Sequence, residues 1–256
     1  MYRKLLFELG REGRKGHILP RCDVPEKPIG EAIPVQHLRE NPADLPQVAE
    51  NEVVRHYTAL STMNHHVDKS FYPLGSCTMK YNPKISEKLA GIPAFSQLHP
   101  DQNLSQVQGA LQILYELQEY LKSITGMDAV TLQPAAGSQG ELVGLLLMQR
   151  YHKAKKEDRS IILIPDSAHG TNPASAAISG YKIETIKSNS QGVVDLDDLK
   201  AKISRDVAGL MLTNPNTLGI FDHQVKEIKD ILESVDALFY MDGANMNALF
   251  GIVRPG

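Results

Sequence analysis

The sequence predicts an α/β domain with a mainly parallel sheet, preceded by an extended amino-terminal arm. From about residue 130 onward, short apolar segments alternate with segments of helical periodicity, a pattern typical of parallel strands covered by helices. Among the first 50 residues, six prolines prevent any long helix. We therefore assign residues 1–100 to an arm with short helices and residues 101–256 to the large sheet domain.

The expected elements of the large domain follow from this periodicity. A long amphipathic helix is predicted from Leu104 to Leu121, with Gly126 as its stop. Strands are expected at 130–132, 161–164, 183–186, 209–212 and 237–241. Helices are expected at 140–151, 173–179, 197–203 and 224–232, with Asp195 as the cap of the third. In the arm, apolar residues at helical spacing predict ordered segments at 53–63 and 85–89.

Composition and charge narrow the classes of function. The chain has 256 residues, 42% of them hydrophobic, and a formal net charge of -3 with both signs mixed along its length. This balance argues against a nucleic-acid or membrane partner. Two cysteines, Cys22 and Cys77, are too few for a disulfide framework. An apolar start interrupted at Glu8 does not resemble a secretion signal, so we expect a cytoplasmic protein.

In a parallel sheet, ligands bind beyond the carboxyl ends of the strands, and the loops at these ends are unusual here. After the first expected strand, Gly137, Ser138 and Gln139 lead into a helix. Small residues and free amides at a helix start suit a phosphate group. The alternative is a plain tight turn in which Ser138 caps the helix. The run matches neither the dinucleotide nor the P-loop fingerprint.

Three further strand ends carry polar residues. His169 follows the strand at 161–164 and has room to lie against a ligand ring or to act as acid or base, although a lone histidine is more often a surface or capping residue. Asn214 follows the strand expected at 209–212 and presents an amide, unless it only forms an Asn-Pro turn. Asp242 ends the last strand, where a carboxylate needs a positive partner. We expect no metal site.

The four loops lie at successive strand ends, so we interpret them as parts of one ligand-binding site. They offer contacts to a phosphate, a flat aromatic ring, a ring oxygen and a protonated ring nitrogen. Pyridoxal 5'-phosphate (PLP) has all four groups. The sequence therefore predicts a PLP site at the carboxyl edge of the sheet.

Several long motifs make the chain resemble the glycine decarboxylase P-protein family. They are 71–83 (FYPLGSCTMKYNP), 133–141 (QPAAGSQGE), 166–175 (DSAHGTNPAS), 212–219 (LTNPNTLG) and 240–248 (YMDGANMNA). The start of the chain is similar to the second subunit of the two-subunit form. The resemblance implies an aminotransferase-like, fold-type I PLP large domain that is incomplete here and is preceded by the amino-terminal arm.

The resemblance also implies individual roles at the site. The phosphate would be held by Gly137, Ser138 and Gln139, and His169 would stack on the pyridine ring. Asp242 would keep the ring nitrogen protonated, with Ala244 on the opposite ring face and Asn214 near the phenolic oxygen. His169 and Asp242 are the candidate catalytic residues. The residues expected on the substrate side are Ser76, Cys77 and Thr78.

The activity implied is PLP-dependent decarboxylation of glycine, with transfer of the aminomethyl group to the lipoyl group of H-protein. The implied partners are glycine, lipoylated H-protein and a first P-protein subunit in a hetero-oligomer. The lysine that carries the cofactor in the family would follow the aspartate strand, yet no lysine follows Asp242 here. We expect a fragment of a working subunit that is inactive alone. The alternatives are a non-catalytic chain of the family, or another fold-type I enzyme such as an aminotransferase or cysteine desulfurase.

Overall fold

A computed structural model of the chain describes residues 4–41, 43–70 and 81–256. The chain divides into two compact units, Met1–Pro73 and Leu74–Gly256. This division lies before residue 100, and the boundary expected there between arm and large domain stays a prediction. The three residues expected on the substrate side, Ser76, Cys77 and Thr78, lie outside the described residues.

The first unit contains short helical turns and one longer helix. Its elements are η1 (Leu6–Glu8), α1 (Ile29–Ala32), η2 (Val35–His37) and α2 (Glu50–Met63), so the helix expected at 53–63 is confirmed. Glu52 caps the start of α2 by accepting the Ala49 amide at 2.9 Å, and it also pairs with Arg14. That amide and the guanidinium hold the pKa of Glu52 below its ordinary value.

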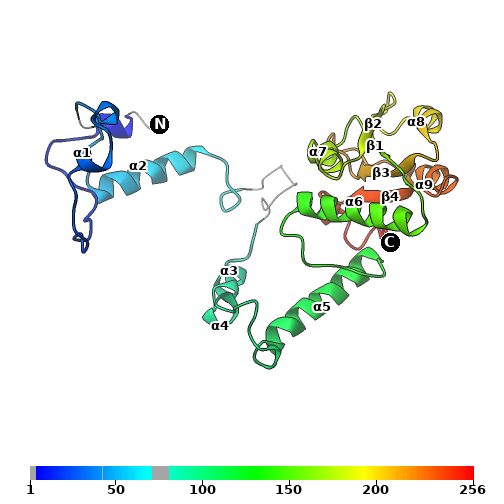
Figure 1. The fold of residues 1–256 in the computed structure, drawn as a ribbon, viewed down its shortest axis with the longest axis horizontal. Helices are drawn as coiled ribbons and strands as arrows, with labels where there is room; N and C mark the ends of the chain where they lie inside the picture. Colours follow the sequence, from blue (N-terminus) through cyan, green and yellow to red (C-terminus); the bar gives the residue numbers. More distant parts are fainter. Residues whose placement is uncertain (1–3, 42, 71–80) are drawn as a thin grey trace. The chain divides into compact units, whose positions relative to one another are not determined.

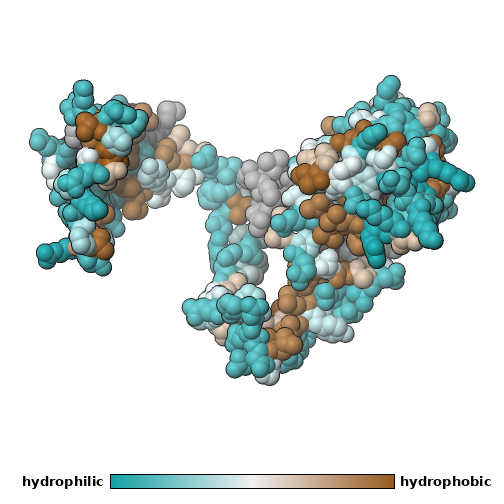
Figure 2. Space-filling model, in the orientation of Figure 1, coloured by the Kyte–Doolittle hydropathy of each residue, from teal (hydrophilic) through white to brown (hydrophobic). Residues whose placement is uncertain are grey.

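Four helical elements precede the sheet in the second unit. They are α3 (Lys84–Ala90), α4 (Pro93–Ser96), η3 (Leu104–Gln106) and α5 (Gln108–Thr125). Gly126 ends α5 in the left-handed conformation at φ 78°, which glycine adopts without strain. Leu114, Leu117 and Tyr120 of α5 are exposed, and apolar side chains gather along this helix in Figure 2. In the described residues, no helix combines the length and apolar character needed to cross a membrane.

The sheet of the second unit is parallel throughout its described strands. These are β1 (Ile161–Pro165), β2 (Lys182–Ile186), β3 (Val207–Thr213) and β4 (Leu238–Asp242), in the order β2-β1-β3-β4 (Figure 1). They confirm four of the five expected strands. The strand expected at 130–132 is wrong. There the Val130 carbonyl accepts the Gln118 side-chain amide at 2.9 Å, and the segment joins no ladder in the described chain.

Helices cover both faces of the sheet and bury its apolar side chains. On one face, α6 (Gly137–Ala154) and α7 (Thr171–Ile178) pack on a cluster that includes Ile162 and Met211. On the other face, α8 (Leu196–Lys202) and α9 (Val225–Glu233) pack on a cluster that includes Leu210. The expected α/β class and all four expected sheet helices are confirmed. Asp195 caps α8 through its side chain, as predicted.

Gly209 lies where β3 closely approaches Leu238 of β4 and Met148 of α6. A Cβ atom there would lie 2.6 Å from the Leu238 carbonyl oxygen and 2.8 Å from the Met148 sulfur. Gly209→Ala is therefore expected to lower the free energy of unfolding by about 1–3 kcal/mol in urea titrations. Gly109→Ala is the matched control, because a Cβ on this α5 residue meets open space among the described residues. The control should gain about 0.5–1 kcal/mol. Equal stability of the Gly209 variant and the unsubstituted chain would contradict the packing described here.

Candidate functional site

The carboxyl edge of the sheet contains the point where the chain reverses its direction across the sheet. After β1 the chain moves outward to β2 and then returns to the other side of β1 as β3. Helices α7 and α8 make these two connections on opposite faces. In open α/β sheets the ligand crevice lies at this switch point. The loops after β1 and β3 therefore border the expected crevice, and they contain His169 and Asn214.

The start of α6 is open to solvent. The helix begins at Gly137, three residues before the start expected from the sequence, and Ala136 is its cap. Ser138 therefore lies in the first turn of α6, and the interpretation of Ser138 as the cap is wrong. Within the described residues, Ala136 gives the helix no side-chain cap, and a Cβ on Gly137 or Gly140 would meet open space. The Gln139 amide donates to the Ala136 carbonyl at 3.1 Å, whereas the amides of Gly137 and Ser138 make no hydrogen bond within the described residues and can donate to an anion.

His169 is held by a chain of side chains that reaches the interior. Its Nδ1 lies 2.8 Å from the Thr171 hydroxyl, and that hydroxyl donates to Glu141 Oε1 at 2.6 Å. The Ser175 hydroxyl donates to Glu141 Oε2 at 2.7 Å. Glu141 is buried and lies one turn into α6, whereas His169 is exposed. The first turns of α6 and α7 are therefore joined directly behind His169.

Asp242 is fixed at the end of β4 by neutral donors. Asn172, which is fully buried, donates to Asp242 Oδ2 at 3.1 Å. The Thr213 hydroxyl lies between the two, 3.2 Å from Asn172 Oδ1 and 3.4 Å from Asp242 Oδ2, and its one proton can serve either. The Ala244 amide donates to Asp242 Oδ1 at 3.1 Å. Three groups hold the carboxylate in one place, and its charge is free to meet a cationic group of a ligand.

Asn214 makes structural contacts within its own loop. Its side chain donates to the Asp222 carbonyl at 3.2 Å and accepts the Asp222 amide at 3.0 Å. The Asp222 carboxylate in turn accepts the buried Val194 amide and the Gln224 amide, each at 2.9 Å. The amide of Asn214 is thus buried and occupied, in accordance with a structural role for the turn. Its expected position near a ring oxygen stays a prediction.

Hydrogen bonds tie two of the predicted site residues to neighbouring helices. His169 is joined to α6 through Thr171, and Asp242 is joined to α7 through Asn172. Ala244 is exposed beside Asp242. Gly137, Ser138 and Gln139 lie at the start of the helix that also carries Glu141, but no hydrogen bond joins them to the other predicted site residues in the described structure. Their joint use of one ligand stays a prediction.

Sequence reasoning missed the residues whose hydrogen bonds support His169 and Asp242. Glu141, Thr171 and Asn172 were not singled out, although all three lie within the motifs quoted above. The available signal was an acidic residue, Glu141, one turn after the start of an expected helix. If such a residue is buried, it requires hydrogen-bond donors from a neighbouring segment. The pairing of Glu141 with two hydroxyls of α7 depends on tertiary structure, so local spacing alone could not show it.

Tyr240 gives a pH-dependent test of the buried part of this site. Burial raises the pKa of Tyr240 from 10.0 to about 12, and the carboxylates of Asp242 and Glu141 act in the same direction. Between these values the unfolded chain releases the proton and the folded chain retains it, so stability falls as pH rises. Tyr240→Phe should show a smaller fall between pH ~10 and pH ~12 in urea titrations. An equal fall in both proteins would contradict this environment.

Comparison with known proteins identifies the family. The family model described as glycine cleavage system P-protein matches residues 24–256. The chain belongs to this family. Over 256 residues it is 60% identical to the probable glycine dehydrogenase (decarboxylating) subunit 2 of Chloroherpeton thalassium, covering all of this chain and 52% of the relative. The chain thus spans about half the length of the curated relatives it matches.

Solved structures show the fold of this P-protein chain. An inhibitor-bound glycine decarboxylase (P-protein) of the glycine cleavage system is similar over 83% of this chain and 47% of its own, with a TM-score of 0.61 and 22% identity. The TDC of Oryza sativa, solved with PLP and tryptamine, is similar over 81% and 49%, with a TM-score of 0.54 and 13% identity. The expected aminotransferase-like, fold-type I large domain is confirmed as a partial domain.

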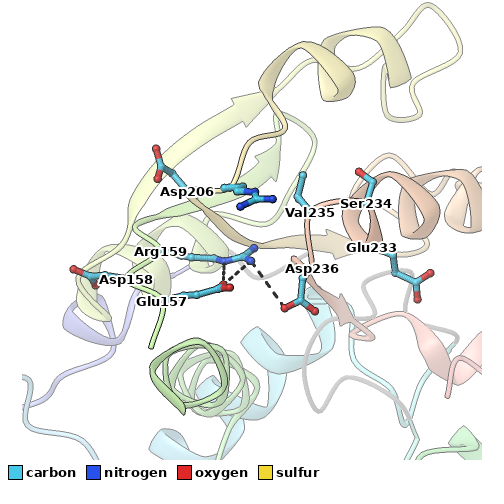
Figure 3. A pocket seen from close by; sticks show the side chains of 9 residues that line it. Glu157, Asp158, Arg159, Asp206, Glu233, Ser234, Val235 and Asp236 are labelled. Carbon is cyan, nitrogen blue, oxygen red and sulfur yellow. Dashed lines mark hydrogen bonds and ion pairs between the residues drawn. The ribbon is translucent and has the colours of Figure 1, made fainter. Parts of the chain in front are cut away.

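A hollow of about 500 Å³ lies at the opposite, amino edge of the sheet in this P-protein chain. There Arg159 lies between the carboxylates of Glu157 and Asp236, at 2.6 and 4.0 Å (Figure 3). Lys155 also pairs with Asp236 at 2.6 Å. His152, Glu157 and Asp236 are close enough to hold a metal ion. However, the two cations already neutralise these carboxylates, so we interpret the cluster as an ion-pair network.

Proposed function

We propose that this chain supplies the phosphate-binding, ring-stacking and ring-nitrogen contacts of a PLP site in a glycine-decarboxylating P-protein. The observation that carries the proposal is the open, uncapped start of α6 at the same sheet edge as the fixed carboxylate of Asp242. An anion site and a cation site at one switch point suit a ligand that has both charges. Family membership and the named relatives support glycine decarboxylation as the activity of the whole protein.

The residues present fit the cofactor chemically. A phosphate needs amide donors without a competing cap, and the first turn of α6 offers them beside Ser138. A protonated ring nitrogen needs a carboxylate in a fixed position, and Asp242 has three neutral donors and no lysine or arginine partner among the described residues. The exposed ring of His169 is available to a flat ligand ring.

Each side chain then has a defined task in catalysis. When bound, PLP serves as the electron sink for loss of carbon dioxide from an amino acid. The Asp242 carboxylate holds a proton on the ring nitrogen, because an adjacent negative charge favours the cationic form. The amides of Gly137 to Gln139 hold the phosphate end, and His169 supports one ring face. Ala244 lies next to Asp242 and would border the other ring face, while Asn214 fixes the loop through Asp222.

The remaining parts of the reaction belong to the whole protein. We propose glycine as substrate, the lipoyl group of H-protein as acceptor of the aminomethyl group, and a first P-protein subunit as partner. The names of the relatives support a subunit of glycine dehydrogenase. No lysine follows Asp242 in these 256 residues, so we expect non-covalent cofactor binding and no glycine turnover by this chain alone.

Equilibrium dialysis with PLP, pyridoxal and inorganic phosphate tests the proposed site. We expect PLP to bind more tightly than either part, because it contacts both the start of α6 and Asp242. Ser138→Glu places a negative charge in the first turn of α6 and should weaken PLP more than pyridoxal. Ser190→Glu, on an exposed turn between β2 and α8, is the matched control and should leave both affinities unchanged. Equal affinity for PLP and pyridoxal in the unsubstituted chain would overturn the phosphate assignment.

A further inference from the structure

Glu141 is a buried carboxylate whose two bonds are both to hydroxyl groups. It is 4% exposed, and its oxygens accept hydrogen bonds from the Thr171 hydroxyl at 2.6 Å and the Ser175 hydroxyl at 2.7 Å. No cation pairs with it among the described residues. A buried charge is normally retained only where its bonds satisfy it and serve a purpose. Its position directly behind His169 indicates what that purpose is.

The number of protons available fixes which group donates in each hydrogen bond from Glu141 through Thr171 to His169. A hydroxyl has one proton to donate, and a carboxylate that accepts from two hydroxyls is a stronger acceptor for the Thr171 hydroxyl than an imidazole nitrogen. The Thr171 oxygen must then accept from His169 Nδ1, 2.8 Å away. The Thr171 backbone amide lies 3.2 Å from the same nitrogen and competes as a donor to it. The shorter hydroxyl contact, backed by a carboxylate, outweighs the longer amide contact.

We infer that Glu141 is a positioning residue that acts through Thr171 to fix the tautomer of His169. In the neutral ring the proton is then on Nδ1, and Nε2 carries the lone pair. Nε2 therefore meets a ligand as an acceptor and not as a donor. The same bonds fix the plane of the ring, because rotation of His169 would break the contact with Thr171. The use of this ring toward PLP rests on the proposed function, whereas the tautomer does not.

Nitrogen-15 NMR of the full chain without ligand measures the tautomer at pH ~9, where an ordinary histidine is neutral. In the unsubstituted protein we expect the shift of a protonated Nδ1 and an unprotonated Nε2 for His169. Thr171→Val removes the hydroxyl and leaves the backbone amide as the donor to Nδ1, so the two shifts should exchange. Glu141→Ala frees the Thr171 proton for Nδ1 and should have the same effect. Thr171→Ser keeps the hydroxyl and should restore the original pattern.

Ser175→Ala is the matched control, since it removes the other bond to Glu141 and leaves Thr171 in place. The inference predicts an unchanged tautomer in this variant, even where stability falls. PLP affinity, measured on the same variants, should fall up to about tenfold with Thr171→Val and recover with Thr171→Ser. Failure of the unsubstituted chain to bind PLP would overturn the proposed function alone. A proton on Nε2 in the unsubstituted chain, or no change with Thr171→Val, would overturn the role of Glu141.

Discussion

Asp242→Asn is expected to weaken PLP binding to this chain by about 30-fold, equivalent to about 2 kcal/mol for a lost charge-assisted hydrogen bond. The amide has no negative charge, so it no longer favours the protonated ring nitrogen. Nitrogen-15 labelled PLP should accordingly show a protonated ring nitrogen in the unsubstituted chain and an unprotonated one in the variant. Dialysis and NMR on the same samples would provide both measurements.

Asp166→Asn is the control for this change. Asp166 also follows a strand end, but its carboxylate accepts the Ser188 amide at 3.2 Å and pairs with the Ser188 hydroxyl. It has no role in the proposed site, so PLP affinity should stay unchanged. If Asp242→Asn bound PLP as tightly as the control, with the same protonation state, the assignment of Asp242 to the ring nitrogen would be wrong.

Asp222→Ala is expected to lower the free energy of unfolding by about 3 kcal/mol, because two backbone amides lose a charged acceptor. Asp222 is 1% exposed and accepts the amides of Val194 and Gln224. The Val194 amide is buried, so water cannot replace the carboxylate without opening the loop. Urea unfolding gives the measurement, and PLP dialysis should show a parallel loss through the loop held by Asn214.

Asp158→Ala provides the comparison for an exposed aspartate. Asp158 is exposed beside the hollow at the amino edge of the sheet, so its loss should change stability by no more than about 0.5 kcal/mol. A cost below about 1 kcal/mol for Asp222→Ala would show that the loop does not depend on this carboxylate.

The sequence predicted the sheet domain well where local periodicity and burial agree. Strands β1, β3 and β4 are mainly apolar runs, whereas β2 alternates polar residues with Ile183 and Ile186, and the structure confirms all four. The segment from Val130 to Leu132 is only three residues long with Thr131 at its centre, and it forms no ladder in the described residues. A strand depends on a neighbour as well as on its own residues, and local sequence does not contain that information.

The candidate site was only partly predictable for a related reason. His169 and Asp242 were singled out because His169 lies in the loop after β1 and Asp242 ends β4, where the sheet rule directs attention. Glu141 on α6 supports His169 through Thr171 and precedes it by 28 residues. Asn172 on α7 donates to Asp242 and precedes it by 70 residues. Asn214 was assigned to a ligand from its type and place, yet its side chain is bonded to Asp222. Such pairings follow from the fold and not from spacing.

A crystal structure of this chain with bound PLP tests the central claim most directly. We predict the phosphate at the amides of Gly137 to Gln139, the ring nitrogen within hydrogen-bonding distance of Asp242, and His169 against one ring face. PLP bound elsewhere, such as in the hollow beside Arg159, or a phosphate remote from the start of α6, would contradict the proposed site.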